Sequence, residues 1–128
     1  MKIKFLYLII LFLGLSNIAS AAEEQVIVYK NTPEADLTMT ILRPDLKKKS
    51  RKGTPAILYF FGGGFRGGAL DQFRPQAEML RDKGMIAIMV EYRVKLRHNV
   101  LPNKGIEDAR TAIRYVRANA KELGIDPN

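Results

Sequence analysis

The hydrophobic positions of this chain fall into short apolar runs that are typical of strands. Residues 26–29 and 37–43 are predicted to be strands, the second because polar and apolar side chains alternate along it. Residues 56–61 and 85–90 are apolar at every position. Such uninterrupted runs favour strands that are buried on both faces of a sheet.

Two further segments have the spacing of amphipathic helices. Residues 73–83 carry Pro75 in the first turn, where proline is tolerated, and Gly84 after them is a natural cap. In residues 106–123 the apolar positions recur at steps of three and four, which predicts one buried face. That predicted face comprises Ile106, Ala109, Ile113, Val116, Ala120 and Leu123. Strands that alternate with helices after an initial strand pair predict an α/β domain with a mixed sheet.

The first twenty-one residues have the features of a signal peptide. Lys2 and Lys4 precede an apolar stretch at 5–15, and Ala19-Ser20-Ala21 is a small-x-small cleavage site. The apolar stretch is shorter than the about 20 residues that a membrane-spanning helix needs. We therefore expect residues 1–21 to be removed and residues 22–128 to be secreted or periplasmic, without stable membrane insertion. An uncleaved anchor is the alternative.

The chain is basic, with a formal net charge of +8 and no cysteine. Its densest basic cluster is formed by Lys47, Lys48, Lys49, Arg51 and Lys52. Such a cluster could bind nucleic acid, but neither a recognition helix nor interleaved aromatic residues accompany it. We interpret it as a solvated loop and expect no nucleic-acid partner. Because no group of His, Asp and Glu has metal-ligand spacing, no metal is expected either.

The most distinctive segment is a glycine-rich stretch that directly follows the apolar run at 56–61. Five glycines lie between residues 62 and 68. Glycine permits positive φ angles and lets backbone N–H groups approach a ligand closely. A strand that opens into such a loop therefore predicts a site lined with hydrogen-bond donors, suited to an anion.

Two kinds of anion are compatible with this loop. Gly62, Gly64 and Gly67 match the dinucleotide fingerprint, and Glu91 at the end of the next strand could bind a ribose. That fingerprint needs a helix that starts at the glycines, whereas Pro75 and the residues before it separate the two here. The oxyanion of an acyl-transfer reaction fits a strand, glycine triplet, loop and helix better.

Several motifs in order resemble the α/β-hydrolase esterases and lipases, closest to the acetyl or feruloyl esterase-like branch. Residues 60–65, Phe-Phe-Gly-Gly-Gly-Phe, resemble the His-Gly-Gly-Gly-type loop of that family, and residues 91–93 resemble its Asp-Tyr-Arg after the fourth strand. Residues 108–117 resemble the helix that leads to the nucleophile elbow, and residues 124–128 the run before the elbow strand. The similarity covers residues 25–128.

The resemblance implies the N-terminal half of an α/β-hydrolase fold, a mixed and mostly parallel sheet with flanking helices, truncated before the nucleophile-elbow strand. Its sheet order would be 1-2-4-3-5, so the strand at 56–61 would pair with a fifth strand beyond residue 128. The implied activity is that of a serine-type carboxylic ester hydrolase without a cofactor. A small ester is the implied substrate, with acylated polysaccharide as one candidate.

The resemblance also implies roles for individual residues. The backbone N–H groups of Gly63 and Gly64 would form the oxyanion hole, and Gly62 would shape the turn. Phe65 closes the motif as a supporting residue. Phe61 stands where the better-known motif has His, so the hydrogen bond of that His to the neighbouring backbone is lost.

Two charged residues are candidates for supporting the loop. Asp71 lies close enough in the sequence to steady the glycines. Arg93 could pair with Glu91, Glu107 or Asp108 and brace the floor of the site. An exposed surface pair is the alternative for Arg93.

The sequence contains no nucleophile for the predicted site. It has no Gly-x-Ser-x-Gly, and Ser50 is its last serine. His98, the single histidine, precedes every place where that nucleophile would follow, and we expect it to be a solvent-exposed loop residue. The chain alone is therefore expected to be inactive. The alternatives are a non-catalytic truncated product, an exported domain that binds a partner through its exposed strand edge, and a nucleotide-binding domain.

Overall fold

The computed structural model describes residues 23–45 and 53–128. The predicted signal peptide and the basic cluster at 47–52 lie outside the described residues. In the part that is described, no helix is long and apolar enough to cross a membrane.

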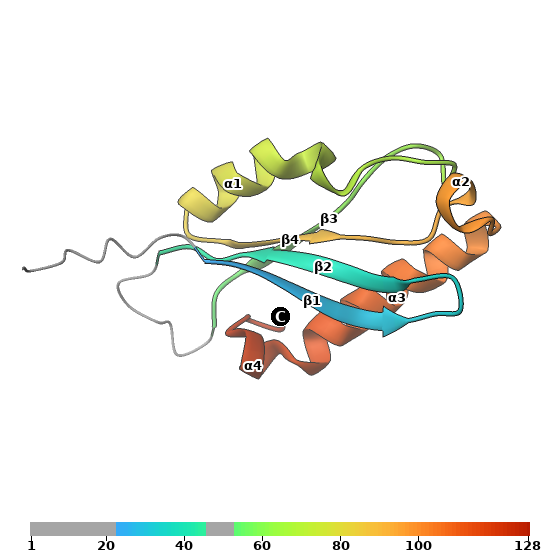
Figure 1. Cartoon of the computed structure of the whole chain (residues 1–128). Helices are drawn as coiled ribbons and strands as arrows, with labels where there is room; N and C mark the ends of the chain where they lie inside the picture. Colours follow the sequence, from blue (N-terminus) through green and yellow to red (C-terminus); the bar gives the residue numbers. More distant parts are fainter. Residues whose placement is uncertain (1–22, 46–52) are drawn as a thin grey trace, which may run out of the picture.

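Within the described residues, four strands form one mixed sheet in the order β1-β2-β4-β3 (Figure 1). Strands β1 (Glu24–Asn31) and β2 (Asp36–Leu42) form an antiparallel hairpin. Strand β4 (Ile86–Val90) pairs antiparallel with β2 and parallel with β3 (Ala56–Phe60). The mixed sheet is as predicted, and this order agrees with the implied 1-2-4-3. Among the described strands, one pairing is parallel and two are antiparallel, because the hairpin and its junction with β4 reverse direction.

Helices cover both faces of the sheet. On one face lie a short 3-10 turn, η1 (Leu70–Phe73), and α1 (Arg74–Asp82), while α3 (Pro102–Ala118) and α4 (Ala120–Leu123) cover the other (Figure 1). A short helix, α2 (Lys95–His98), follows β4 at one end of the sheet. The main core lies between the sheet and α3 and α4. A smaller apolar cluster under α1 contains Leu42, Ala77, Ala87 and Met89.

The two apolar runs differ in burial. All five residues of β4 are buried, as predicted, because β4 lies between β2 and β3. The prediction that the run at 56–61 is buried on both faces is wrong for β3, whose five residues are only half-buried. The reason is that β3 forms an edge of the described sheet, so one flank has no neighbouring strand.

The predicted buried face of the segment at 106–123 is confirmed at Val116, Ala120 and Leu123, but in the first part of α3 it differs by about one position. The buried residues of α3 are Gly105, Asp108, Ala112 and Val116. Ile106 and Ile113, which the apolar spacing placed inside, are 44% and 37% exposed. The spacing failed because the buried face includes a charged residue, Asp108, that no count of apolar positions would put there.

The predicted helix at 106–123 is also two helices. It begins earlier, at Pro102, whose missing N–H is tolerated in a first turn. It is interrupted at Asn119, whose side-chain amide donates to the carbonyl oxygen of Tyr115 at 2.8 Å. After α4, Gly124 takes a left-handed conformation with a φ of +70° and ends the helical segment.

Candidate functional site

The glycine loop follows β3 at its carboxyl end and folds back on itself. Gly63 and Gly64 have φ angles of +138° and +59°, which glycine adopts without a steric penalty. The N–H group of Arg66 donates to the carbonyl oxygen of Gly63 at 3.1 Å and closes the turn. A Cβ atom on Gly63 would lie 2.5 Å from the carbonyl oxygen of Gly67. The loop can therefore take this shape only with glycine at position 63.

The three consecutive glycines differ in the use of their N–H groups. The N–H group of Gly62 donates to Oε1 of Gln72 at 2.5 Å. The N–H groups of Gly63 and Gly64 have no acceptor among residues 23–45 and 53–128, and both residues are exposed. Two adjacent donors are thus available to an external oxygen atom, while Gly62 is used within the protein.

An aromatic cluster packs beneath the loop. The rings of Phe61 and Tyr92 are stacked, with centroids 4.2 Å apart and planes 16° from parallel. The ring of Phe65 meets Tyr92 edge-on at 6.1 Å. The Tyr92 hydroxyl donates to the carbonyl oxygen of Phe61 at 2.5 Å. The guanidinium of Arg97 lies over the Phe61 ring and donates to the carbonyl oxygen of Gly68.

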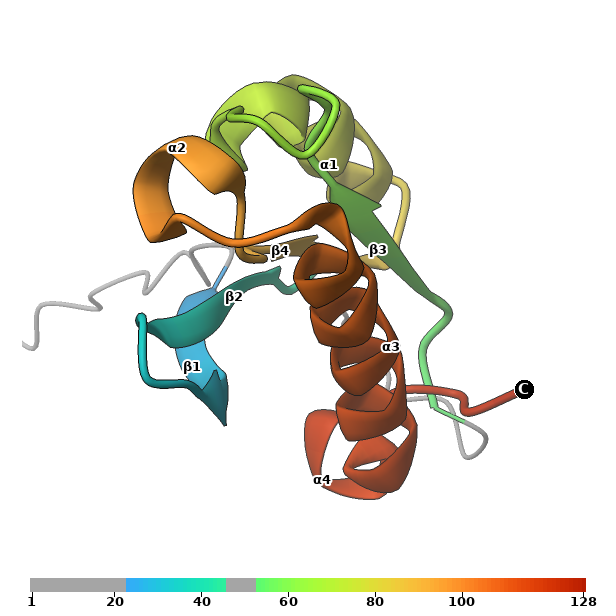
Figure 2. The same cartoon turned by 90° about the vertical axis from the view of Figure 1, so that its right-hand side faces the viewer.

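Helix α2 lies against the far side of the glycine loop. The backbone N–H groups of Lys95 and Leu96 donate to the carbonyl oxygens of Phe65 and Arg66, each at 2.9 Å. Figure 2 shows α2, the loop and the start of α3 at the same end of the molecule. The segment after β4 and the segment after β3 therefore form one connected structure.

A buried ion network lies behind Tyr92. Asp108 has no exposed surface, and both of its oxygens bind Arg93: Oδ2 accepts from Nε and Oδ1 from a terminal nitrogen, each at 2.9 Å. Oδ2 also accepts from the backbone N–H of Arg93 at 3.1 Å, and Oδ1 accepts from Nζ of Lys30 at 2.6 Å. The guanidinium of Arg93 reaches Glu34 as well, at 2.9 Å. The network joins the hairpin, the end of β4 and α3.

The charges in this network keep Asp108 ionised. Burial alone would raise the pKa of Asp108, but hydrogen bonds from Arg93 and Lys30 outweigh it and lower that pKa below its ordinary value. The hydrogen bond from Arg93 likewise lowers the pKa of Glu34. Arg93 is thus held between two carboxylates.

The structure selects one of the three partners predicted for Arg93. Asp108 binds it, whereas Glu91 accepts a hydrogen bond from β2 and Glu107 forms an exposed pair within α3. The alternative of an exposed surface pair is wrong, because Arg93 is only 5% exposed.

For two other candidate residues, the contacts or burial in the structure differ from those that the sequence predicted. Asp71 is exposed and binds Arg74 at 2.9 Å, and its neighbour Gln72 makes the contact with the glycine loop. His98, predicted to be solvent-exposed, is half-buried, and its Nδ1 accepts from the backbone N–H of Val94 at 3.0 Å. It therefore stabilises the first turn of α2.

Two residues at the site were not singled out from the sequence. Tyr92 belonged to a family-like motif, but nothing in the spacing indicated a bond to Phe61, 31 positions away. Gln72 carries no pattern of its own. In the part of the chain that the structure describes, no group of three His, Asp or Glu side chains could hold a metal ion.

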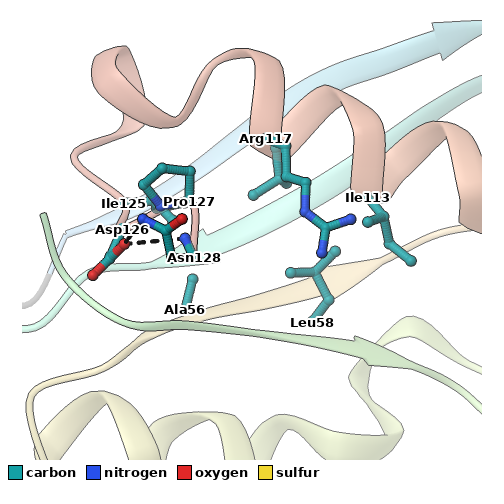
Figure 3. Close-up of a pocket in the computed structure, with 9 residues that line it drawn as sticks. Ala56, Leu58, Ile113, Arg117, Ile125, Asp126, Pro127 and Asn128 are labelled. Carbon is teal, nitrogen blue, oxygen red and sulfur yellow. Dashed lines mark hydrogen bonds between the residues drawn. The ribbon is translucent and has the colours of Figure 1, made fainter.

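A cavity of about 160 Å³ lies away from the glycine loop, between the edge of β3 and α3 (Figure 3). Leu58 lines it from β3, Ile113 and Arg117 from α3, and Pro127 from the final residues. Those residues approach β3 through a parallel bridge between Thr54 and Ile125. The cavity contains none of the candidate site residues.

Known proteins resemble this chain both in sequence and in structure. The BD-FAE family model matches residues 39–128. An esterase from the planctomycete Thermogutta terrifontis, solved with propionate bound, is similar to this chain with 46% sequence identity and a TM-score of 0.75. That match covers 81% of this chain and 38% of the esterase.

Two curated relatives that are named esterases also match this chain. Carboxylesterase NlhH of Mycobacterium tuberculosis is 37% identical over 79 residues, which are 61% of this chain and 24% of the relative. Chlorogenic acid esterase of Aspergillus niger is 29% identical over 126 residues, which are 88% of this chain and 24% of the relative. The chain thus spans between 24% and 38% of the length of these three proteins.

Proposed function

This chain belongs to the BD-FAE family of α/β-hydrolase esterases, and we propose that it supplies the oxyanion-binding part of a serine-type carboxylic ester hydrolase. The observation that carries the proposal is the pair of adjacent N–H groups of Gly63 and Gly64. They are exposed, have no acceptor among the described residues and lie at the carboxyl end of a parallel strand.

The chemistry follows from where charge develops. When a serine hydroxyl adds to an ester carbonyl and a histidine takes its proton, negative charge collects on the carbonyl oxygen. Gly63 and Gly64 would donate two hydrogen bonds to that oxygen. In a comparable site the loss of one such donor costs about 3–4 kcal/mol of transition-state stabilisation. The nucleophile, base and acid are assigned to no residue of this sequence, which has no Gly-x-Ser-x-Gly.

The proposed substrate is an ester with a small acyl group. In support, Thermogutta terrifontis esterase structures were solved with propionate and with butyrate. We propose an acetylated or similarly acylated polysaccharide as this ester, so that a sugar hydroxyl group is its alcohol component. No nucleic acid takes part in this function.

We also propose that the protein is exported. Lys2, Lys4, the apolar stretch at 5–15 and the Ala19-Ser20-Ala21 site support cleavage near Ala21. The mature protein would then be secreted or periplasmic. Edman sequencing of the protein from the periplasm or the culture medium should show an N-terminus near residue 22. An intact Met1 would contradict the proposed export.

A glycine substitution tests the oxyanion role. In the protein encoded by the complete reading frame, Gly63→Ala should lower kcat for 4-nitrophenyl acetate by about 100- to 1,000-fold. The reason is that the new Cβ atom cannot fit 2.5 Å from the Gly67 carbonyl oxygen, so the two N–H groups must turn away.

A matched control distinguishes the loss of the oxyanion site from a general effect of backbone strain. Gly84 also has a positive φ, +93°, and a Cβ atom there would meet nothing within 4 Å. Gly84→Ala should therefore cost about 1–2 kcal/mol of stability and leave kcat unchanged. Equal losses of kcat in the two variants would refute the oxyanion role.

A further inference from the structure

We propose that Tyr92 and Gln72 are positioning residues that together hold one peptide unit, Phe61–Gly62, and thereby aim the N–H groups of Gly63 and Gly64. Their importance for catalysis rests on the esterase function proposed above. We call the two hydrogen bonds that Tyr92 and Gln72 make to this peptide unit the clamp. Its effect on the order of the loop can be measured separately from activity.

The two side chains grip opposite ends of the same peptide unit. The Tyr92 hydroxyl donates to the carbonyl oxygen of Phe61, and Oε1 of Gln72 accepts from the N–H group of Gly62, each at 2.5 Å. A peptide unit is planar, so its carbonyl and N–H point in opposite directions. With both groups bonded, the plane cannot rotate without breaking a hydrogen bond.

This peptide unit is where the loop most needs such a restraint. The three glycines at 62–64 have a larger range of backbone conformations than any other residue type. Gly63 and Gly64 adopt positive φ angles and have no acceptor for their N–H groups among the described residues. Fixing the unit that precedes them anchors the start of the loop from which both N–H groups project. Donors that are already aimed need no reorganisation when charge develops.

Tyr92 is itself held in place from two sides. Its ring is stacked on Phe61 at 4.2 Å, and the following residue, Arg93, is tied by its backbone N–H to buried Asp108. Burial raises the pKa of Tyr92 above its ordinary value, so the hydroxyl stays protonated and keeps its proton to donate. A Cβ atom on Gly105 would lie 3.1 Å from the Tyr92 ring, which shows how closely the start of α3 packs against that ring.

Gln72 makes the second contact from a different part of the fold. It lies in η1, on the side of the sheet that α1 covers, whereas Tyr92 follows β4. The clamp therefore connects the glycine loop to two separate parts of the fold. A residue that only filled space would not place an acceptor opposite the Gly62 N–H group.

The test measures the order of individual N–H groups by ¹⁵N relaxation in the protein encoded by the complete reading frame. We expect order parameters near 0.85 for Gly63 and Gly64 in the wild type, falling below about 0.6 in Tyr92→Phe and in Gln72→Ala. Gln72→Glu keeps an acceptor oxygen and should retain the wild-type values. The matched controls are Tyr59→Phe and Gln76→Ala. The ring of Tyr59 stacks on Phe73, and Gln76 is an exposed residue of α1.

A kinetic measurement accompanies the relaxation data. Both clamp variants should lower kcat for 4-nitrophenyl acetate by about tenfold to a hundredfold with little change in KM, since only the transition state carries the oxyanion. Unchanged order parameters in both clamp variants, or an equal loss in the controls, would overturn the clamp. If Tyr92→Phe does not fold, Gln72→Ala decides, because Gln72 is exposed.

The two measurements also separate the clamp from the esterase function. Loss of order in the clamp variants of a protein that hydrolyses no ester would support the clamp and refute the function. Ester hydrolysis with fully retained order in both variants would support the function and refute the clamp.

Discussion

Asp108 is the residue on which most of the polar structure near the site depends. Its carboxylate is fully buried and accepts hydrogen bonds from the Arg93 side chain, the Arg93 backbone and Lys30. Removing one partner of a buried ion pair leaves the other charge without compensation, which typically costs about 3–5 kcal/mol. The network therefore stabilises one position of the segment after β4.

The Asp108→Asn variant should lose about 3 kcal/mol or more in urea unfolding at neutral pH. Asp82→Asn is the control, because Asp82 is 67% exposed and its pair with Arg81 should contribute less than about 1 kcal/mol. A loss at Asp108 no larger than at Asp82 would show that the buried network contributes little.

The same carboxylate predicts a dependence on pH. The pKa of Asp108 is lowered in the folded protein, so its stabilisation is fully present above the unfolded pKa of about 3.9. It is lost as the pH falls from there through the folded pKa. Wild-type stability should therefore drop more steeply below about pH 4 than that of Asp108→Asn. Parallel acid-unfolding curves would contradict the assignment.

The sequence could indicate only part of this network. Arg93 and its three candidate partners lie within a short segment, so proximity made the pairing with Asp108 foreseeable. Lys30 lies 78 positions from Asp108, and Glu34 lies 59 positions from Arg93. Only the folding of the hairpin onto α3 brings them together, and no local pattern encodes that contact.

At the level of elements, apolar spacing located strands and helices better than it oriented them. The runs at 56–61 and 85–90 look alike in sequence, yet β4 is fully buried and β3 is not. Position in the sheet decides this difference, and a run of apolar residues carries no information about its neighbours. The face of α3 was misplaced for a related reason, since Asp108 is buried by charge pairing and not by hydrophobicity.

The edge strand β3 leads to a prediction about solubility. A half-buried apolar edge exposes unpaired backbone groups and invites association with other chains. A recombinant segment of residues 22–128 should therefore be poorly soluble. It should also show no esterase activity above background, because it contains no Gly-x-Ser-x-Gly. Clean monomeric behaviour in sedimentation, with saturable ester hydrolysis, would contradict both expectations.

A pair of charge variants identifies the responsible edge. Leu58→Lys adds a charge on β3, where charged side chains oppose edge pairing, and should raise the soluble fraction. Val28→Lys adds the same charge on β1, at the other end of the sheet, where Val28 is already 47% exposed. Equal gains from both variants would indicate a general effect of charge and would rule out the β3 edge as the cause.

At the level of the whole molecule, the fold class followed from the alternation of elements, but the strand order did not. Spacing alone cannot say that β4 lies between β2 and β3; the family resemblance implied it, and the described strands have that order. The glycine loop was likewise recognisable from composition. Which of its N–H groups remain available depends on Gln72, which accepts from Gly62, while Tyr92 binds the carbonyl oxygen of Phe61 from another part of the fold.

The central claim is that this chain carries the oxyanion loop of a serine ester hydrolase, and the reading frame of the gene tests it most directly. Sequencing the locus through codon 128 should reveal an in-frame continuation that encodes Gly-x-Ser-x-Gly, followed by Asp or Glu and then His. A stop codon directly after Asn128 would contradict the claim, because the natural product would then have no nucleophile for Gly63 and Gly64 to assist.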